Sequence, residues 1–142
     1  MKRLLKISVV VILLSSCKGS ADNKAPELAN AMCDCFDSFQ NNLSADAKKL
    51  MKEVSTAAKP QEAMMAGMAK FTPEDAKAFA DQLKTIGDKN SSVFKCLQDF
   101  DKKHANETTA DKKALTDKLL MEMQKDGGCY VGAAIVNLNP KK

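Results

Sequence analysis

Residues 26–43, PELANAMCDCFDSFQNNL, combine a helical pattern with two closely spaced cysteines. Pro26 and Glu27 suit a first helical turn, because proline needs no amide donor there and an acidic side chain favours the positive end of the helix dipole. The apolar side chains recur at intervals of three and four residues, which places them on one stripe of a helix; they are Leu28, Met32, Cys35, Phe36, Phe39 and Leu43. This stretch therefore predicts a helix from Pro26 to about Asn41.

Helical signals continue directly after this stretch. Ser44 can cap a second helix that reaches about Ala58. The inner face of that helix consists of Ala47, Leu50, Met51 and Val54. Lys59-Pro60 interrupts it, because proline cannot donate a helical hydrogen bond and disfavours helix in the residue before it. A short helix rich in Ala and Met is expected to follow, from Pro60 to about Lys70.

Thr72-Pro73-Glu74-Asp75 is the most complete helix start in the chain, with a capping hydroxyl, a proline at the first position and two acids. Its inner stripe is Ala76, Phe79, Ala80, Leu83 and Ile86. Gly87 is expected to end this helix in the left-handed conformation. Asp88 or Asn90 is expected to cap the next helix, which carries Val93, Cys96, Leu97, Phe100 and His104 at helical spacing.

The last third of the chain predicts two further segments. Thr108 or Thr109 opens a helix that ends at Gly127-Gly128, with Leu115, Leu119, Leu120 and Met123 facing inward. The apolar run from Cys129 to Leu138 fits a helix or a strand, and we assign it to a short closing helix because everything else is helical. The expected fold is all-α, a small bundle of about five or six helices.

Composition agrees with one helical domain. The chain has 142 residues with six Gly, four Pro and no Trp, which argues against β-sandwiches and against collagen-like or disordered chains. Its net charge of +4 comes mostly from Lys2, Arg3 and Lys6. Without these three, the 22 basic side chains become 19, against 18 acidic ones. Such a balance does not provide the basic face that nucleic acid requires, so no nucleic-acid partner is expected.

The amino terminus has the pattern of an export signal. Basic residues precede an apolar stretch from Ile7 to Leu14, which is too short to span a bilayer. Leu14-Ser15-Ser16-Cys17 follows at once, and this tetrad resembles the lipobox of bacterial lipoproteins. The resemblance implies that residues 1–16 are a signal peptide, that Cys17 receives a diacylglycerol, and that Cys17 becomes the acylated first residue of the mature protein.

Two or more acyl chains hold a protein on a membrane stably, so the expected partner of Cys17 is a lipid bilayer. In Gram-negative lipoproteins an Asp after the lipid-bearing Cys typically marks retention at the inner membrane. Lys18 stands there, so the resemblance implies an outer-membrane location, on its periplasmic or surface face. Residues 17–25 are expected to form the lipid-bearing Cys and a flexible polar tether, followed by a helical domain over residues 26–142.

The other four cysteines, Cys33, Cys35, Cys96 and Cys129, are an even number in an exported chain, which predicts two disulfides. On one helix Cys33 and Cys35 point about 160° apart and cannot bond to each other without unwinding it. Each is therefore expected to reach Cys96 or Cys129. Both pairings stay open, although the position of Cys35 near the centre of the apolar stripe favours Cys35 with Cys96.

A soft-metal site is the alternative for these residues. Cys33-x-Cys35 together with Met64, Met65 and Met68 offers the thiolate and thioether ligands that suit Cu(I). Methionine on a helix is more commonly core filler, and we expect that here, with no metal or cofactor. His104, the single histidine, is expected to cap or pack the end of its helix rather than act as a base.

No spacing in the chain matches a catalytic nucleophile with its base, a phosphate loop or a multi-histidine zinc site. The arrangement of Cys-x-Cys in the first helix, one Cys mid-chain and one near the end is similar to small, functionally unassigned helical lipoproteins of Gram-negative bacteria. The expected function is that of a non-enzymatic interaction or structural module on the envelope membrane, with a protein partner there. The alternative is a carrier of a small ligand or copper that uses Met and Cys side chains.

Overall fold

The computed structural model describes residues 24–104, 112–125 and 127–139. Within these ranges every regular element is a helix: α1 (Ala25–Asn41), α2 (Ala45–Thr56), α3 (Pro60–Met68), α4 (Pro73–Ile86), α5 (Ser92–His104), α6 (Lys112–Lys125) and α7 (Tyr130–Leu138). The all-α class is confirmed, but the described part has seven helices rather than five or six. Pro60 separates α3 from α2, and Gly127-Gly128 separates α7 from α6, so each short segment forms its own helix.

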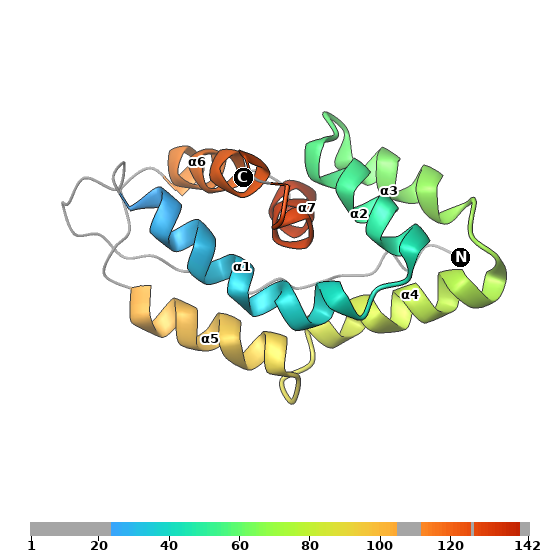
Figure 1. Cartoon of the computed structure of the whole chain (residues 1–142), viewed down its shortest axis with the longest axis horizontal. Coiled ribbons are helices and arrows are strands. Elements are labelled where there is room, and N and C mark those ends of the chain that lie inside the picture. The colour runs from blue at the N-terminus through green and yellow to red at the C-terminus, as the bar shows by residue number, and fades with distance from the viewer. Residues whose placement is uncertain (1–23, 105–111, 126, 140–142) are drawn as a thin grey trace.

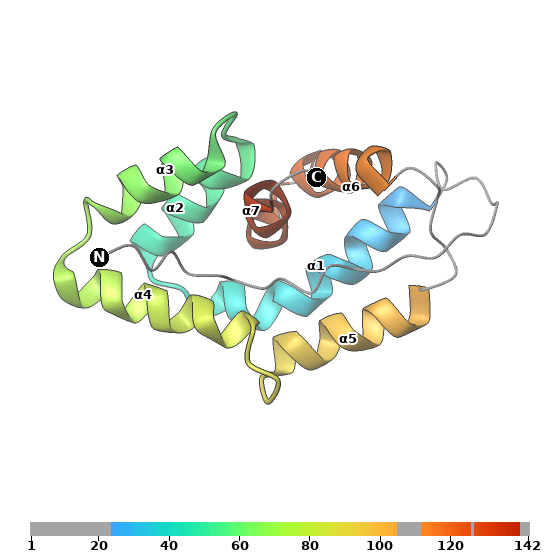
Figure 2. The ribbon, with the colours of Figure 1, turned by 180° about the vertical axis from the view of Figure 1, so that it is seen from behind.

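Helix α1 runs through the middle of the molecule and separates two groups of helices (Figure 1). It contacts α5 on one side and α6 and α7 on the other. Helix α4 continues the row of α5, whereas α2 and α3 pack around α7. The view from behind shows the same division, with α4 and α5 along one edge and α6, α7, α2 and α3 along the opposite edge (Figure 2).

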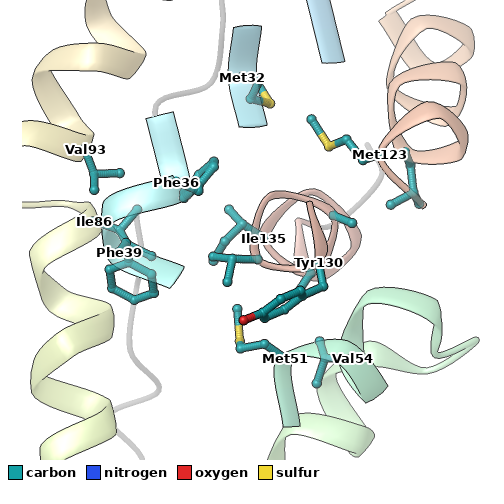
Figure 3. Close-up of a cluster of buried hydrophobic side chains, with 14 of the residues drawn as sticks. Met32, Phe36, Phe39, Met51, Val54, Ile86, Val93, Met123, Tyr130 and Ile135 are labelled. Carbon is teal, nitrogen blue, oxygen red and sulfur yellow. The ribbon is translucent and has the colours of Figure 1, made fainter. Parts of the chain in front are cut away.

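Helix α7 is the most enclosed element of the bundle. It contacts α1, α2, α3 and α6, and the residues from Tyr130 to Ile135 are all buried. Figure 3 shows Met51 and Val54 of α2 beside Tyr130, and Met123 of α6 on another side of α7. This apolar surrounding explains the continuous apolar run, since a helix buried on all sides needs no polar face.

Two predicted helix starts are confirmed at atomic detail. The Ser44 hydroxyl accepts a hydrogen bond from the backbone N–H of Ala47 at 3.2 Å. The Thr72 hydroxyl accepts one from the N–H of Asp75 at 3.1 Å and donates one to the Asp75 carboxylate at 2.7 Å. Each cap satisfies an amide that the first helical turn leaves without a partner.

Two predictions between α4 and α5 are wrong. Gly87 ends α4 with a right-handed φ of −92°, because its N–H closes a tight last turn onto the carbonyl of Lys84 at 3.1 Å. The α5 cap is Ser91, whose hydroxyl accepts from the N–H of Phe94 at 3.1 Å, rather than Asp88 or Asn90. The Asp88 carboxylate instead accepts from the N–H of Asn90 at 2.9 Å and holds the turn before the helix.

The connection from α6 to α7 contains the left-handed glycine that the α4 end lacks. Gly127 has a φ of +61°, a conformation that residues with a Cβ rarely adopt. The helix start expected at Thr108 or Thr109 lies outside the described residues, which resume at Lys112. Among the described helices, none has both the length and the hydropathy that spanning a bilayer would require.

Candidate functional site

The cysteines of α1 tie together the two helix groups on either side of it. Cys33 is bonded to Cys129, which precedes α7, with 5.4 Å between the Cα atoms. Cys35 is bonded to Cys96 of α5, with 5.5 Å between the Cα atoms. Because the two positions point to opposite sides of one helix, each bond fastens a different group. Two disulfides are thus confirmed, in the pairing that the position of Cys35 favours.

The surroundings of the two bonds differ. Cys35 is 5% exposed, while Cys33, Cys96 and Cys129 are half-buried. The approach of α7 to α1 depends on Gly132: a Cβ there would lie 2.9 Å from the Cys129 sulfur and 3.3 Å from the Phe36 ring. A side chain at this position would push α7 away from the Cys33–Cys129 bond, so the glycine permits the close packing.

The C-terminal end of α2 is held by amide side chains from two other helices. The Asn137 amide of α7 donates to the carbonyl oxygens of Val54 and Ala57, both at 2.9 Å. The Gln124 amide of α6 donates to the carbonyl of Ser55 at 2.6 Å. The last carbonyls of a helix lack intrahelical donors, so these contacts satisfy them while joining α2 to α6 and α7.

Two further amides make the same type of long-range contact. Gln40 of α1 donates to the carbonyl of Gly128 at 2.9 Å, and Gln82 of α4 donates to the carbonyl of Asn42 at 3.2 Å. Neither these contacts nor those at the end of α2 were predicted from the sequence. The one available signal was the placement of Gln124 and Asn137 on helices with strongly apolar inner faces, which does not identify an acceptor.

The residues of the possible soft-metal site are not arranged as metal ligands. Both cysteines are in disulfides and therefore supply no thiolate to Cu(I). Met64 and Met68 are half-buried against the core, whereas Met65 is 62% exposed. Across the described residues, no group of three or more His, Cys, Asp or Glu side chains is placed to hold a metal ion.

His104 lies at the end of α5 and is buried. Its ring lies 4.8 Å from the Phe100 ring, measured between centroids. The structure thus places this histidine as a packing residue, one of the two roles that the sequence predicts for it.

Four groups elsewhere in the described part of the molecule have shifted pKa values: Lys77, Asp81, Asp101 and Tyr130. On α4, hydrogen bonds and charge attraction from Lys77 and Lys84 lower the pKa of Asp81 to about 2, at distances of 2.7 and 2.6 Å. Burial raises the pKa of Tyr130, whose ring lies 5.2 Å below the Lys52 ammonium. Asp81 is an exposed ion-pair group and Tyr130 a core contact, so neither is arranged as a catalytic acid or base. The pKa of Lys77 is raised by the same ion pair with Asp81, and partial burial raises the pKa of the Asp101 carboxyl.

Leu14-Ser15-Ser16-Cys17 lies outside the described residues, so its resemblance to a lipobox rests on the sequence alone. We compared the chain with protein-family models, with curated proteins and with solved structures, and none of the three comparisons gives a match.

Proposed function

We propose that this protein is a lipid-anchored component of the bacterial envelope, attached through Cys17. The observation that carries the proposal is the use of the five cysteines. Four of them are paired in two disulfides, and the fifth stands in the lipobox-like tetrad Leu14-Ser15-Ser16-Cys17. Stable disulfides suit an oxidising compartment outside the cytoplasm, which is where a lipoprotein signal would deliver the domain.

We further propose that the helical domain works by contact with a protein partner in the envelope rather than by catalysis. The arrangement of its reactive side chains supports this view. The four thiols of the described part are used in bonds between helices, and the imidazole of His104 is packed against Phe100. Function would then depend on surface side chains presented by a rigid, cross-linked bundle.

The anchor can be tested on full-length protein produced in a Gram-negative host and purified in detergent without reductant. We expect an intact mass that lacks residues 1–16, includes the added lipid, and is lower by four hydrogens because of the two disulfides. Cys17→Ala should abolish the lipid mass and leave the protein soluble after cell lysis. A Cys17→Ala protein that still fractionates with membranes would contradict the lipid anchor.

We also propose that the anchored protein lies at the outer membrane, because the residue after Cys17 is Lys18 rather than Asp. This location needs a test of its own. Lys18→Asp should move the lipidated protein from the outer-membrane to the inner-membrane fraction after density-gradient separation. Lys24→Asp is the matched control, because it changes the same charge beyond the residue next to Cys17. An unchanged distribution of both variants, with lipidation intact, would contradict sorting by position 18.

A further inference from the structure

The two disulfides fasten helices that are buried to very different extents. In α7 the six residues from Tyr130 to Ile135 are buried, out of nine, and the helix contacts four others. In α5 only Val93, Phe94 and His104 are buried, out of thirteen residues. Non-covalent packing therefore encloses most of α7, whereas α5 depends on one partly buried face.

Helix α5 lies at the outer edge of the bundle, against α1 and next to α4 (Figure 2). Leu97 and Phe100 pack against the core but remain partly exposed, and the Cys35–Cys96 bond lies in the same face. A helix of thirteen residues is only marginally stable in water without a packing surface. Once detached from α1, α5 would therefore lose its structure as well as its position.

We propose that the Cys35–Cys96 bond is a redox latch: cleavage by a dithiol releases α5 from α1 while the remainder of the bundle stays folded. The Cys33–Cys129 bond is the contrasting case. Its cleavage leaves α7 in place, because α1, α2, α3 and α6 still enclose that helix. This inference is independent of the lipid anchor and concerns the folded domain alone.

The chemistry is ordinary thiol–disulfide exchange. A thiolate of the dithiol attacks the sulfur of Cys96, which is the more accessible partner, since Cys35 is only 5% exposed. The Cys35–Cys96 bond breaks, and Cys35 leaves as a thiolate that takes up a proton. The second thiol of the reagent then attacks the mixed disulfide, which frees Cys96 and leaves the reagent as a disulfide. Two electrons and two protons pass from the dithiol to the protein.

The test compares two double variants of the full-length protein by hydrogen–deuterium exchange with mass spectrometry. Cys35→Ala with Cys96→Ala removes the latch, and alanine avoids placing an unpaired hydroxyl at the buried position 35. Cys33→Ala with Cys129→Ala is the matched control, because it also removes one bond from α1. We expect amides of α5 to exchange about tenfold faster or more in the first variant, with α2 and α7 unchanged. In the control, α5 should keep its protection.

Two results would overturn the latch. One is α5 protection that stays unchanged when the Cys35–Cys96 bond is absent. The other is loss of protection throughout the domain in that variant, which would make the bond a requirement for the whole fold. Wild-type protein titrated with dithiothreitol checks the same point without substitutions: deprotection of α5 should follow the appearance of Cys96 as a free thiol, as measured by alkylation and peptide mass. Deprotection of α7 before α5 would also contradict the proposal.

Discussion

Gly67 of α3 lies directly against the side chain of Leu50 of α2, so close that a Cβ on residue 67 would overlap a Leu50 methyl group. Leu50 is itself buried, so its side chain has little room to move away. This contact sets the distance between α2 and α3, and Gly67 is the one buried residue of α3. The short third helix is therefore held mainly by close backbone approach and half-buried methionines.

Gly67→Ala should lower the free energy of unfolding by about 1–3 kcal/mol, although alanine is the better helix former, because the added methyl group overpacks the contact with Leu50. Urea denaturation measures the change. Gly87→Ala is the control: its Cβ would meet only the Lys84 carbonyl at 3.8 Å, so stability should stay the same or rise by up to about 1 kcal/mol. Equal effects of the two substitutions would show that helix spacing is not set at Gly67.

Asn137→Ala should lower the free energy of unfolding by about 1–3 kcal/mol, because the Ala57 carbonyl loses its side-chain donor and the Val54 carbonyl keeps only the longer bond from the Ala57 N–H at 3.3 Å. Asn42→Ala removes an exposed amide that donates to the Ser38 carbonyl at 2.9 Å, and should cost much less because water replaces that donor. Thermal unfolding of both variants provides the comparison. If Asn42→Ala lowers the stability as much as Asn137→Ala does, then burial of the Asn137 hydrogen bonds is not the reason for their contribution.

The Asp81 carboxyl should titrate near pH 2 in the folded protein, because Lys77 and Lys84 stabilise its charged form. A lowered folded pKa means that the ion pairs contribute to stability above about pH 4 and that this contribution is lost as the pH falls toward 2. The groups are exposed, so 1 M salt should return the pKa toward its ordinary value. NMR titration of the side-chain carboxyl carbon at low and high salt tests this, and a salt-independent pKa would refute the assignment.

Tyr130 should ionise at a higher pH in the folded protein than in urea, because burial disfavours the phenolate. It is the only tyrosine, so the absorbance of the phenolate reports on this residue alone. Since the folded pKa is raised, this contribution to stability is complete below the ordinary pKa of 10.0 and declines as the pH rises above it. Identical titration curves in buffer and in urea would show that the ring is accessible to water.

Local sequence signals predicted the helices and two of their caps well. Thr72 and Ser44 cap their helices as expected, because the interaction involves an amide only three residues away. The same kind of local geometry narrowed the disulfide pairing, since Cys33 and Cys35 point to opposite sides of one helix and cannot bond to each other. Ser91 was missed because Asp88 and Asn90 are equally good caps by residue type, and only the turn geometry decides among them.

Long-range polar contacts were not predictable in this way. An amide such as that of Asn137 is equally satisfied by water, so its sequence position does not reveal that it meets α2, about eighty residues away. The close approach between Gly67 and Leu50 was unpredictable for the same reason, because a glycine in a helix does not identify the residue that it contacts. Both depend on how the helices are placed relative to one another, which local periodicity does not determine.

The position of Cys33 also determines how the domain responds to force. A pull on the chain from the side of Cys17 can extend only the residues before Cys33, roughly half of α1 among them. From there the tension passes through the sulfur–sulfur bond to Cys129 and bypasses the 95 residues between them. A load between the two ends of the chain would therefore act on the first half of α1 and on α7, which follows Cys129, and would leave helices α2 to α6, which lie between the two cysteines, outside the loaded path.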